Sequence, residues 1–119
     1  MNEAQNSKQY DLEERTFRFS KEAITFVKNL PKSIPTQEIA KQLLRSASSI
    51  GANYIEANES LSKKDFFMRV KICRKEAKET IYWLKLVEPQ KEEEHKREWL
   101  IGEATELMKI FGSIIEKAK

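Results

Sequence analysis

The stretch AKQLLRSASSIGANYIEA, residues 40–57, decides the fold class of this chain. Its apolar side chains recur at alternating steps of three and four residues, the spacing of a helix face that packs at a small angle against its neighbours. The pattern predicts a long amphipathic helix over about residues 36–59, opened by Thr36. The seam consists of Ala40, Leu43, Ala47, Ile50, Tyr54, Ala57 and Leu61.

Three further segments show helical periodicity. The first, residues 12–30, ends at Pro31 and carries its apolar stripe at Leu12, Phe19, Ala23, Phe26 and Leu30. The second, residues 63–88, is capped by Ser62, ends before Pro89, and carries Phe66, Val70, Cys73, Ala77, Ile81 and Leu84. The third, residues 92–117, starts among glutamates that favour the positive end of a helix dipole. Its apolar stripe carries Leu100, Ala104, Leu107, Phe111, Ile114 and Ala118.

Four amphipathic helices with short joints place consecutive helices antiparallel. We therefore predict an all-α fold, an antiparallel up-down-up-down four-helix bundle over residues 11–119. Residues 1–10 are polar and are expected to form a flexible N-terminal tail. The 119 residues suit one domain, and three Gly and three Pro supply too few turns for a β-sandwich or barrel.

The residue inventory argues against catalysis. One Cys and one His exclude a disulfide framework and a Cys/His zinc cluster. The pair Glu92-x-x-His95 supplies half of a di-iron ligand set, and the chain has no second His to complete it. Cys73 lies on the apolar seam, where a free Cys acts as a small hydrophobe. We expect no enzyme, no cofactor, no metal and no small-molecule substrate.

Positive charge is concentrated in one segment. The whole chain has a net charge of +3, while residues 63–88 alone contain eight basic and four acidic residues. The basic side chains that project along one face there, roughly opposite the core, are Lys64, Lys71, Arg74, Lys75, Lys78 and Lys85. Such a face can follow a phosphate backbone, pair with an acidic face of another copy, or simply be solvated. The sequence leaves these three readings open.

Several apolar side chains point away from the core stripes. They are Phe17, Ile24, Ile72, Trp83, Trp99 and Ile110. Glu76 and Glu79 share a flank with Ile72 and Trp83. Scattered surface hydrophobes are normal, whereas contiguous exposed patches mark interfaces. We predict that these eight residues form a homo-oligomer interface.

Small residues gather between Ser46 and Asn53. Gly51 inside a helix costs about 1 kcal/mol relative to Ala, and a close approach by another helix would offset that cost. Asn53 lies at the edge of the core, where its amide needs partners. A structural hydrogen-bonding role for Asn53 is favoured over ligand binding.

Four stretches resemble the family of 23S rRNA-intervening-sequence proteins. They are LRSASSIGANYIEA at residues 44–57, SKKDF at 62–66, KEAKETIYWL at 75–84 and DLEERTF at 11–17. The resemblance covers residues 11–117 and implies an antiparallel bundle that assembles into a homopentameric ring. Many members of this family are encoded within insertions in bacterial large-subunit rRNA genes.

A related accessory protein of diversity-generating retroelements contacts reverse transcriptase and nucleic acid through a basic surface. The resemblance thus implies nucleic-acid contacts for Lys71, Arg74, Lys75 and Lys78. We expect a cytoplasmic, non-enzymatic oligomeric scaffold, with RNA or an RNA-binding protein as partner of the basic face. The alternative is a pure self-assembly module. No apolar run approaches the ~18 residues of a membrane span, and the first ten residues are too polar for a signal peptide.

Overall fold

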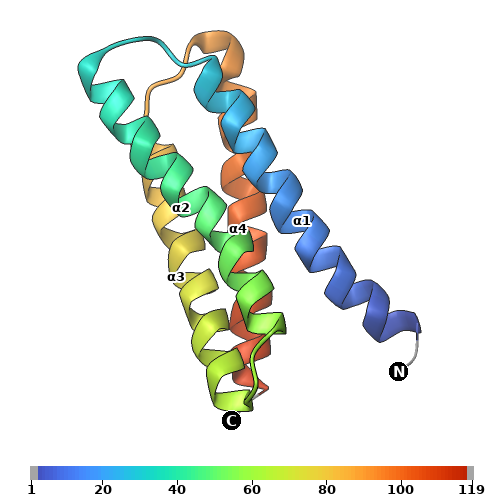
Figure 1. Ribbon diagram of the computed structural model, residues 1–119. Coiled ribbons are helices and arrows are strands. Elements are labelled where there is room, and N and C mark those ends of the chain that lie inside the picture. The colour runs from blue at the N-terminus through green and yellow to red at the C-terminus, as the bar shows by residue number, and fades with distance from the viewer. Residues whose placement is uncertain (1–2, 118–119) are drawn as a thin grey trace.

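The computed structural model describes residues 3–117, with side chains from residue 12 onward. Its helices are α1 (Glu3–Lys28), α2 (Ile34–Asn58), α3 (Lys63–Leu86) and α4 (Glu94–Glu116), and a 3₁₀ turn η1 (Lys91–Glu93) precedes α4. In Figure 1 each helix runs opposite to the one before it, so this part of the chain is an antiparallel up-down-up-down bundle. The predicted all-α fold class is confirmed.

Helix α1 is longer than predicted. It begins at Glu3 rather than near residue 12, so residues 3–10, expected as a tail, are helical. This segment contains no Gly or Pro to interrupt a helix. In Figure 1 the first part of α1 diverges from the other three helices. The flexibility expected of residues 1–10 stays a prediction, and residues 1–2 lie outside the described part of the chain.

The other helix ends follow local capping chemistry. Helix α2 begins at Ile34, two residues before the predicted start, because Ser33 is its N-cap and accepts a hydrogen bond from the Thr36 amide at 3.2 Å. Ser62 caps α3 as predicted, accepting from the Asp65 amide at 3.1 Å. Helix α3 ends at Leu86 rather than residue 88, because a residue before proline, here Glu88, disfavours helical geometry.

The core is formed by the predicted stripes of all four helices. The predicted core residues that are buried are Leu12, Phe19, Ala23, Phe26, Leu30, Leu43, Ala47, Ile50, Tyr54, Ala57, Val70, Cys73, Ala77, Leu84, Leu100, Ala104, Leu107 and Phe111. Four more predicted stripe residues are partly buried against this core: Ala40, Phe66, Ile81 and Ile114. Leu61 lies beyond the end of α2 and is fully exposed. Ala118, the last residue predicted on the stripe of the fourth helix, lies outside the described residues. Ile115 of the last helix, which is not part of the predicted stripe, is buried as well.

Helices α1 and α2 lie close together at Gly51. A Cβ atom added there would lie 3.0 Å from Thr16 Oγ1 and 3.3 Å from Thr16 Cβ. One turn away, the Ser20 hydroxyl donates to the Ala47 carbonyl of α2 at 3.3 Å. The expected close helix approach at Gly51 is therefore present.

Between residues 3 and 117, no helix combines the length and hydrophobicity needed to cross a membrane.

Candidate functional site

The basic residues of α3 form an exposed row along the helix. We call the six predicted cations the basic row: Lys64, Lys71, Arg74, Lys75, Lys78 and Lys85. All six are exposed. None of them makes an ion pair or a side-chain hydrogen bond with a residue that the structure describes. At about 1.5 Å per residue, the row extends over about 32 Å. None of the six charges is thus neutralised by a close ion pair with a described carboxylate.

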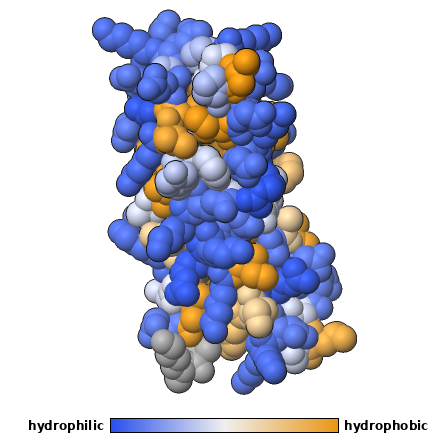
Figure 2. Space-filling model, turned by 90° about the vertical axis from the view of Figure 1, so that its left-hand side faces the viewer, coloured by the Kyte–Doolittle hydropathy of each residue, from blue (hydrophilic) through white to orange (hydrophobic). Residues whose placement is uncertain are grey.

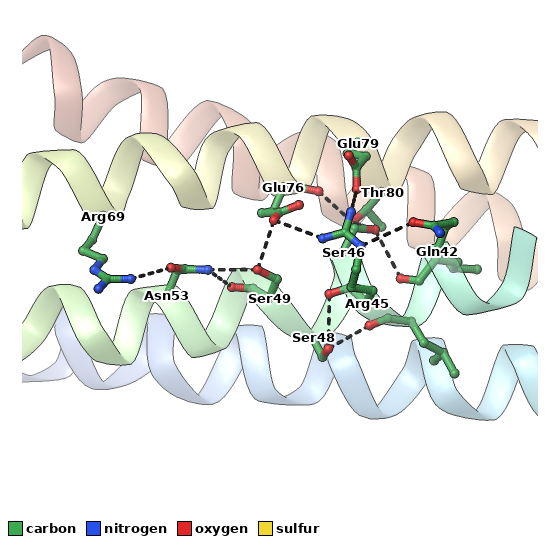
Figure 3. A network of polar contacts seen from close by, with 12 residues as sticks. Gln42, Arg45, Ser46, Ser48, Ser49, Asn53, Arg69, Glu76, Glu79 and Thr80 are labelled. Carbon is green, nitrogen blue, oxygen red and sulfur yellow. Dashed lines mark hydrogen bonds and ion pairs between the residues drawn. The ribbon is translucent and has the colours of Figure 1, made fainter.

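Two of the three acidic residues of α3, Glu76 and Glu79, are held on a different flank by α2. Arg45 Nη1 donates to Glu76 Oε2 at 3.5 Å, and the Arg45 guanidinium also pairs with Glu79 (Figure 3). The Ser49 hydroxyl donates to the same Glu76 oxygen at 3.2 Å, and Glu76 is only 7 % exposed. Sequence reasoning missed Arg45 as their partner. The predicted place of Glu76 and Glu79 at a subunit interface stays a prediction.

Asn53 extends this α2–α3 network. Its Nδ2 donates to the Ser49 carbonyl and hydroxyl, each at 2.9 Å, and its Oδ1 accepts from Arg69 Nη1 at 3.1 Å (Figure 3). Deeper in the core, the Thr80 hydroxyl lies 2.8 Å from the Ser46 hydroxyl. These contacts satisfy Asn53 within the chain and confirm its structural role. They also tie α2 to α3 on the flank that carries the acids.

The predicted apolar interface residues do not form one patch. Ile72 and Trp83 are partly buried on α3, and Trp83 packs against the core. The Trp83 Nε1 atom is buried without a hydrogen-bond partner among the described residues, so the indole acts here through its apolar surface. Phe17 and Trp99 instead line one groove between α1 and α4. Ile24 is exposed on α1, and Ile110 packs partly buried on α4.

Sequence reasoning missed three exposed apolar residues of α3. Met68, Tyr82 and Leu86 join Ile72 in what we call the apolar stripe: Met68, Ile72, Tyr82 and Leu86. The steps from Met68 to Ile72 and from Tyr82 to Leu86 are four residues, a spacing that places side chains on one flank and could have revealed the stripe. Figure 2, viewed from the side where α2 and α3 lie, shows apolar side chains interrupting a mainly hydrophilic surface.

Cys73 is buried between α3 and α2, where its thiol donates to the Ile50 carbonyl at 3.4 Å. Burial raises the pKa of the Cys73 thiol to about 12, so very little thiolate exists near neutral pH. Within residues 3–117, no group of three or more His, Cys, Asp or Glu side chains is placed to hold a metal ion.

Comparisons with known proteins agree with the helical fold and identify a family. A solved structure similar to this one is the 1.70 Å crystal structure of a protein of unknown function from the S23 ribosomal protein family of Bacteroides thetaiotaomicron VPI-5482. The two chains share 32 % sequence identity with a TM-score of 0.72, over 87 % of this chain and 96 % of that chain. Comparison with curated proteins gives no match. The family model described as 23S rRNA-intervening sequence protein matches residues 8–113. This chain belongs to the 23S rRNA-intervening sequence protein family.

Proposed function

We propose that this protein is a non-catalytic helical scaffold that binds RNA through the basic row of α3 and assembles with copies of itself. The observation that carries the RNA proposal is the charge separation on α3. Its two mid-helix glutamates are bound by Arg45, while the six cations of the basic row have no partner among the described residues. RNA supplies a continuous line of negative charge for such a row.

The length of the basic row favours a polyanion as its ligand over a single small anion. A row of about 32 Å spans many phosphates of a strand, and like charges along it repel one another until counterions or phosphates bind. Binding to a phosphate backbone releases the counterions of the nucleic acid, which favours association at low salt. The buried thiol of Cys73 argues against cysteine-based catalysis, because the chain has no other cysteine to act as a nucleophile. An RNA ligand also fits the expected cytoplasmic location.

Salt dependence of RNA binding tests this proposal. The logarithm of the association constant is expected to fall linearly with the logarithm of salt concentration. If the whole basic row contacts phosphates of a single strand, the slope is about −4. Fluorescence anisotropy of a labelled RNA, titrated at KCl concentrations from about 50 to about 300 mM, measures this slope. If the protein assembles but does not bind RNA even at the lowest salt concentration, the RNA proposal is rejected. The alternative of a pure self-assembly module would then be favoured.

The apolar stripe supports the assembly part of the proposal. Replacing Tyr82 and Leu86 together by serine is expected to lower the oligomer mass in light scattering while the far-ultraviolet helical signal stays the same. Both side chains are largely exposed in one chain, so their removal takes little from the core.

Trp83→Ala is expected to lower the oligomer mass more than it lowers helicity, although the loss of packing against the core adds some destabilisation.

The matched control replaces two exposed apolar residues of α2, Ile34 and Ile55, by serine. This variant loses the same kind of surface outside α3 and should keep the wild-type mass. A wild-type protein that sediments at 14.0 kDa in dilute solution would reject self-assembly, and an unchanged mass in the Tyr82/Leu86 variant would reject this assignment of the interface.

A further inference from the structure

A groove of about 840 Å³ lies between α1 and α4, away from the basic row of α3. Two aromatic rings line it from different helices, Phe17 on α1 and Trp99 on α4. Phe17 is 63 % exposed and Trp99 is 43 % exposed, so neither ring is used up in packing the core. The volume lies within the range of about 300–1,000 Å³ that is typical of ligand sites.

One lysine ammonium lies over each of the two rings. The Lys21 ammonium lies 5.6 Å from the centroid of the Phe17 ring, and the Lys96 ammonium lies 5.7 Å from the centroid of the Trp99 ring. Arg18 also lines the groove, is exposed, and makes no ion pair with a described residue. Aromatic faces beside Lys and Arg are the combination that proteins use to bind single-stranded nucleic acid.

The carboxylates near the groove are largely neutralised. Glu103 accepts two hydrogen bonds from the Arg15 guanidinium, at 2.7 and 3.0 Å, which also connect α4 to α1. Glu22 pairs with Lys96. Glu14 is the other lining carboxylate, and the lining also contains the cations Arg15, Arg18 and Lys21. The groove therefore keeps a net positive charge beside its two rings.

We propose that this groove binds unpaired bases of single-stranded RNA, which stack on Phe17 and Trp99 while Arg18 and Lys21 contact the flanking phosphates. The inference rests on the proposed function in taking RNA as ligand, and it assigns a second surface with a different preference. The basic row recognises phosphates in any nucleic acid, whereas the groove requires bases that are free to stack. Stacking tolerates any sequence, because every base has a π-face.

Symmetric pairing of two copies through this same face is disfavoured by charge. If two copies paired through this same face, Arg18 and Lys21 of one would meet the same cations of the other, and like charges across an interface oppose association. A nucleic-acid strand brings negative charge instead. Docking of a different face of another copy into the groove is the alternative that the test below distinguishes.

The test compares three probes: a 12-nucleotide oligoadenylate, an RNA duplex of 12 base pairs, and inorganic polyphosphate, which has charge but no bases. The double variant Phe17→Leu/Trp99→Leu keeps apolar side chains and removes both stacking surfaces. Its affinity for oligoadenylate is expected to fall by about tenfold or more. Its affinity for the duplex and for polyphosphate should stay at the wild-type value.

Tryptophan fluorescence provides an independent readout. The chain contains two tryptophans, so Trp83→Phe leaves Trp99 as the only indole. Oligoadenylate should quench its emission and polyphosphate should not. The quenching should persist when Lys71, Lys75 and Lys78 are replaced by glutamine, which separates the groove from the basic row. If polyanion binding by the basic row proves absent, persistent quenching still supports the groove.

Two results would overturn the inference. One is an equal affinity of wild type and Phe17→Leu/Trp99→Leu for oligoadenylate, or a Trp99 emission that oligoadenylate leaves unchanged. The other is a double variant that has a lower oligomer mass but still binds oligoadenylate and polyphosphate with the wild-type difference in affinity. That result would assign the groove to contact between copies. Wild-type binding to duplex and polyphosphate in either case leaves the basic-row proposal standing.

Discussion

Replacing Lys71, Lys75 and Lys78 together by glutamine is expected to weaken RNA binding by about ten- to hundredfold near 0.15 M salt. These three residues lie in the middle of the basic row, and none has a partner among the described residues whose loss would disturb the fold. Each phosphate contact that disappears removes one released counterion, so the slope against salt should become shallower by about 2. Anisotropy titrations at several salt concentrations measure both quantities.

The control variant replaces Lys28, Lys32 and Lys91 by glutamine. These lysines are exposed as well, but they lie at the end of α1, in the following loop and in η1. Both variants lose the same net charge. Equal weakening of RNA binding in the two variants would therefore indicate a long-range effect of the protein's charge and would contradict a localised site. If the α3 variant instead dissociates into monomers, its lysines belong to a contact between copies.

Gly51→Leu is expected to lower the free energy of unfolding by about 3 kcal/mol, a change at the upper end of overpacking effects. Even a Cβ atom at this position would lie 3.0 Å from Thr16 Oγ1. Thr16 is buried, and its hydroxyl donates to the Leu12 carbonyl at 2.8 Å, which limits how far the side chain can rotate. A larger side chain must therefore push α1 away from α2. Urea unfolding followed by circular dichroism measures the loss.

Gly51→Ala should show a smaller effect, because the gain in helix propensity of about 1 kcal/mol offsets part of the clash with Thr16. Gly102 provides the matched control, since it lies inside α4 and a Cβ atom there would meet nothing within 4 Å. Gly102→Ala should stabilise the protein by up to about 1 kcal/mol, and Gly102→Leu should be tolerated. Equal stabilities for Gly51→Leu and Gly102→Leu would show that α1 does not need this close approach.

The core could be predicted from the sequence because helical periodicity is local. The stripe from Leu43 to Ala57 specifies the buried face of α2 without knowledge of what covers it. Helix ends were predicted less well. The start of α2 depends on the hydroxyl of Ser33 rather than on Thr36, and Leu61 keeps the spacing of the seam although the helix has already ended. Periodicity alone does not show where backbone hydrogen bonding stops.

Local sequence patterns are enough to predict the all-α class, the four amphipathic helices, the small-residue contact at Gly51 and the basic face of α3. Each of these depends on residues within a few turns of one helix. Only the tertiary structure decided which charges remain unpaired and which rings share a groove. Arg45 reaches Glu76 and Glu79 across 31 and 34 residues of sequence, and Arg15 reaches Glu103 across 88. The groove of Phe17 and Trp99 likewise exists only once α1 lies beside α4. Ion pairs and grooves between helices depend on which side chains the packing brings within a few ångströms, and the spacing along one helix does not contain that information.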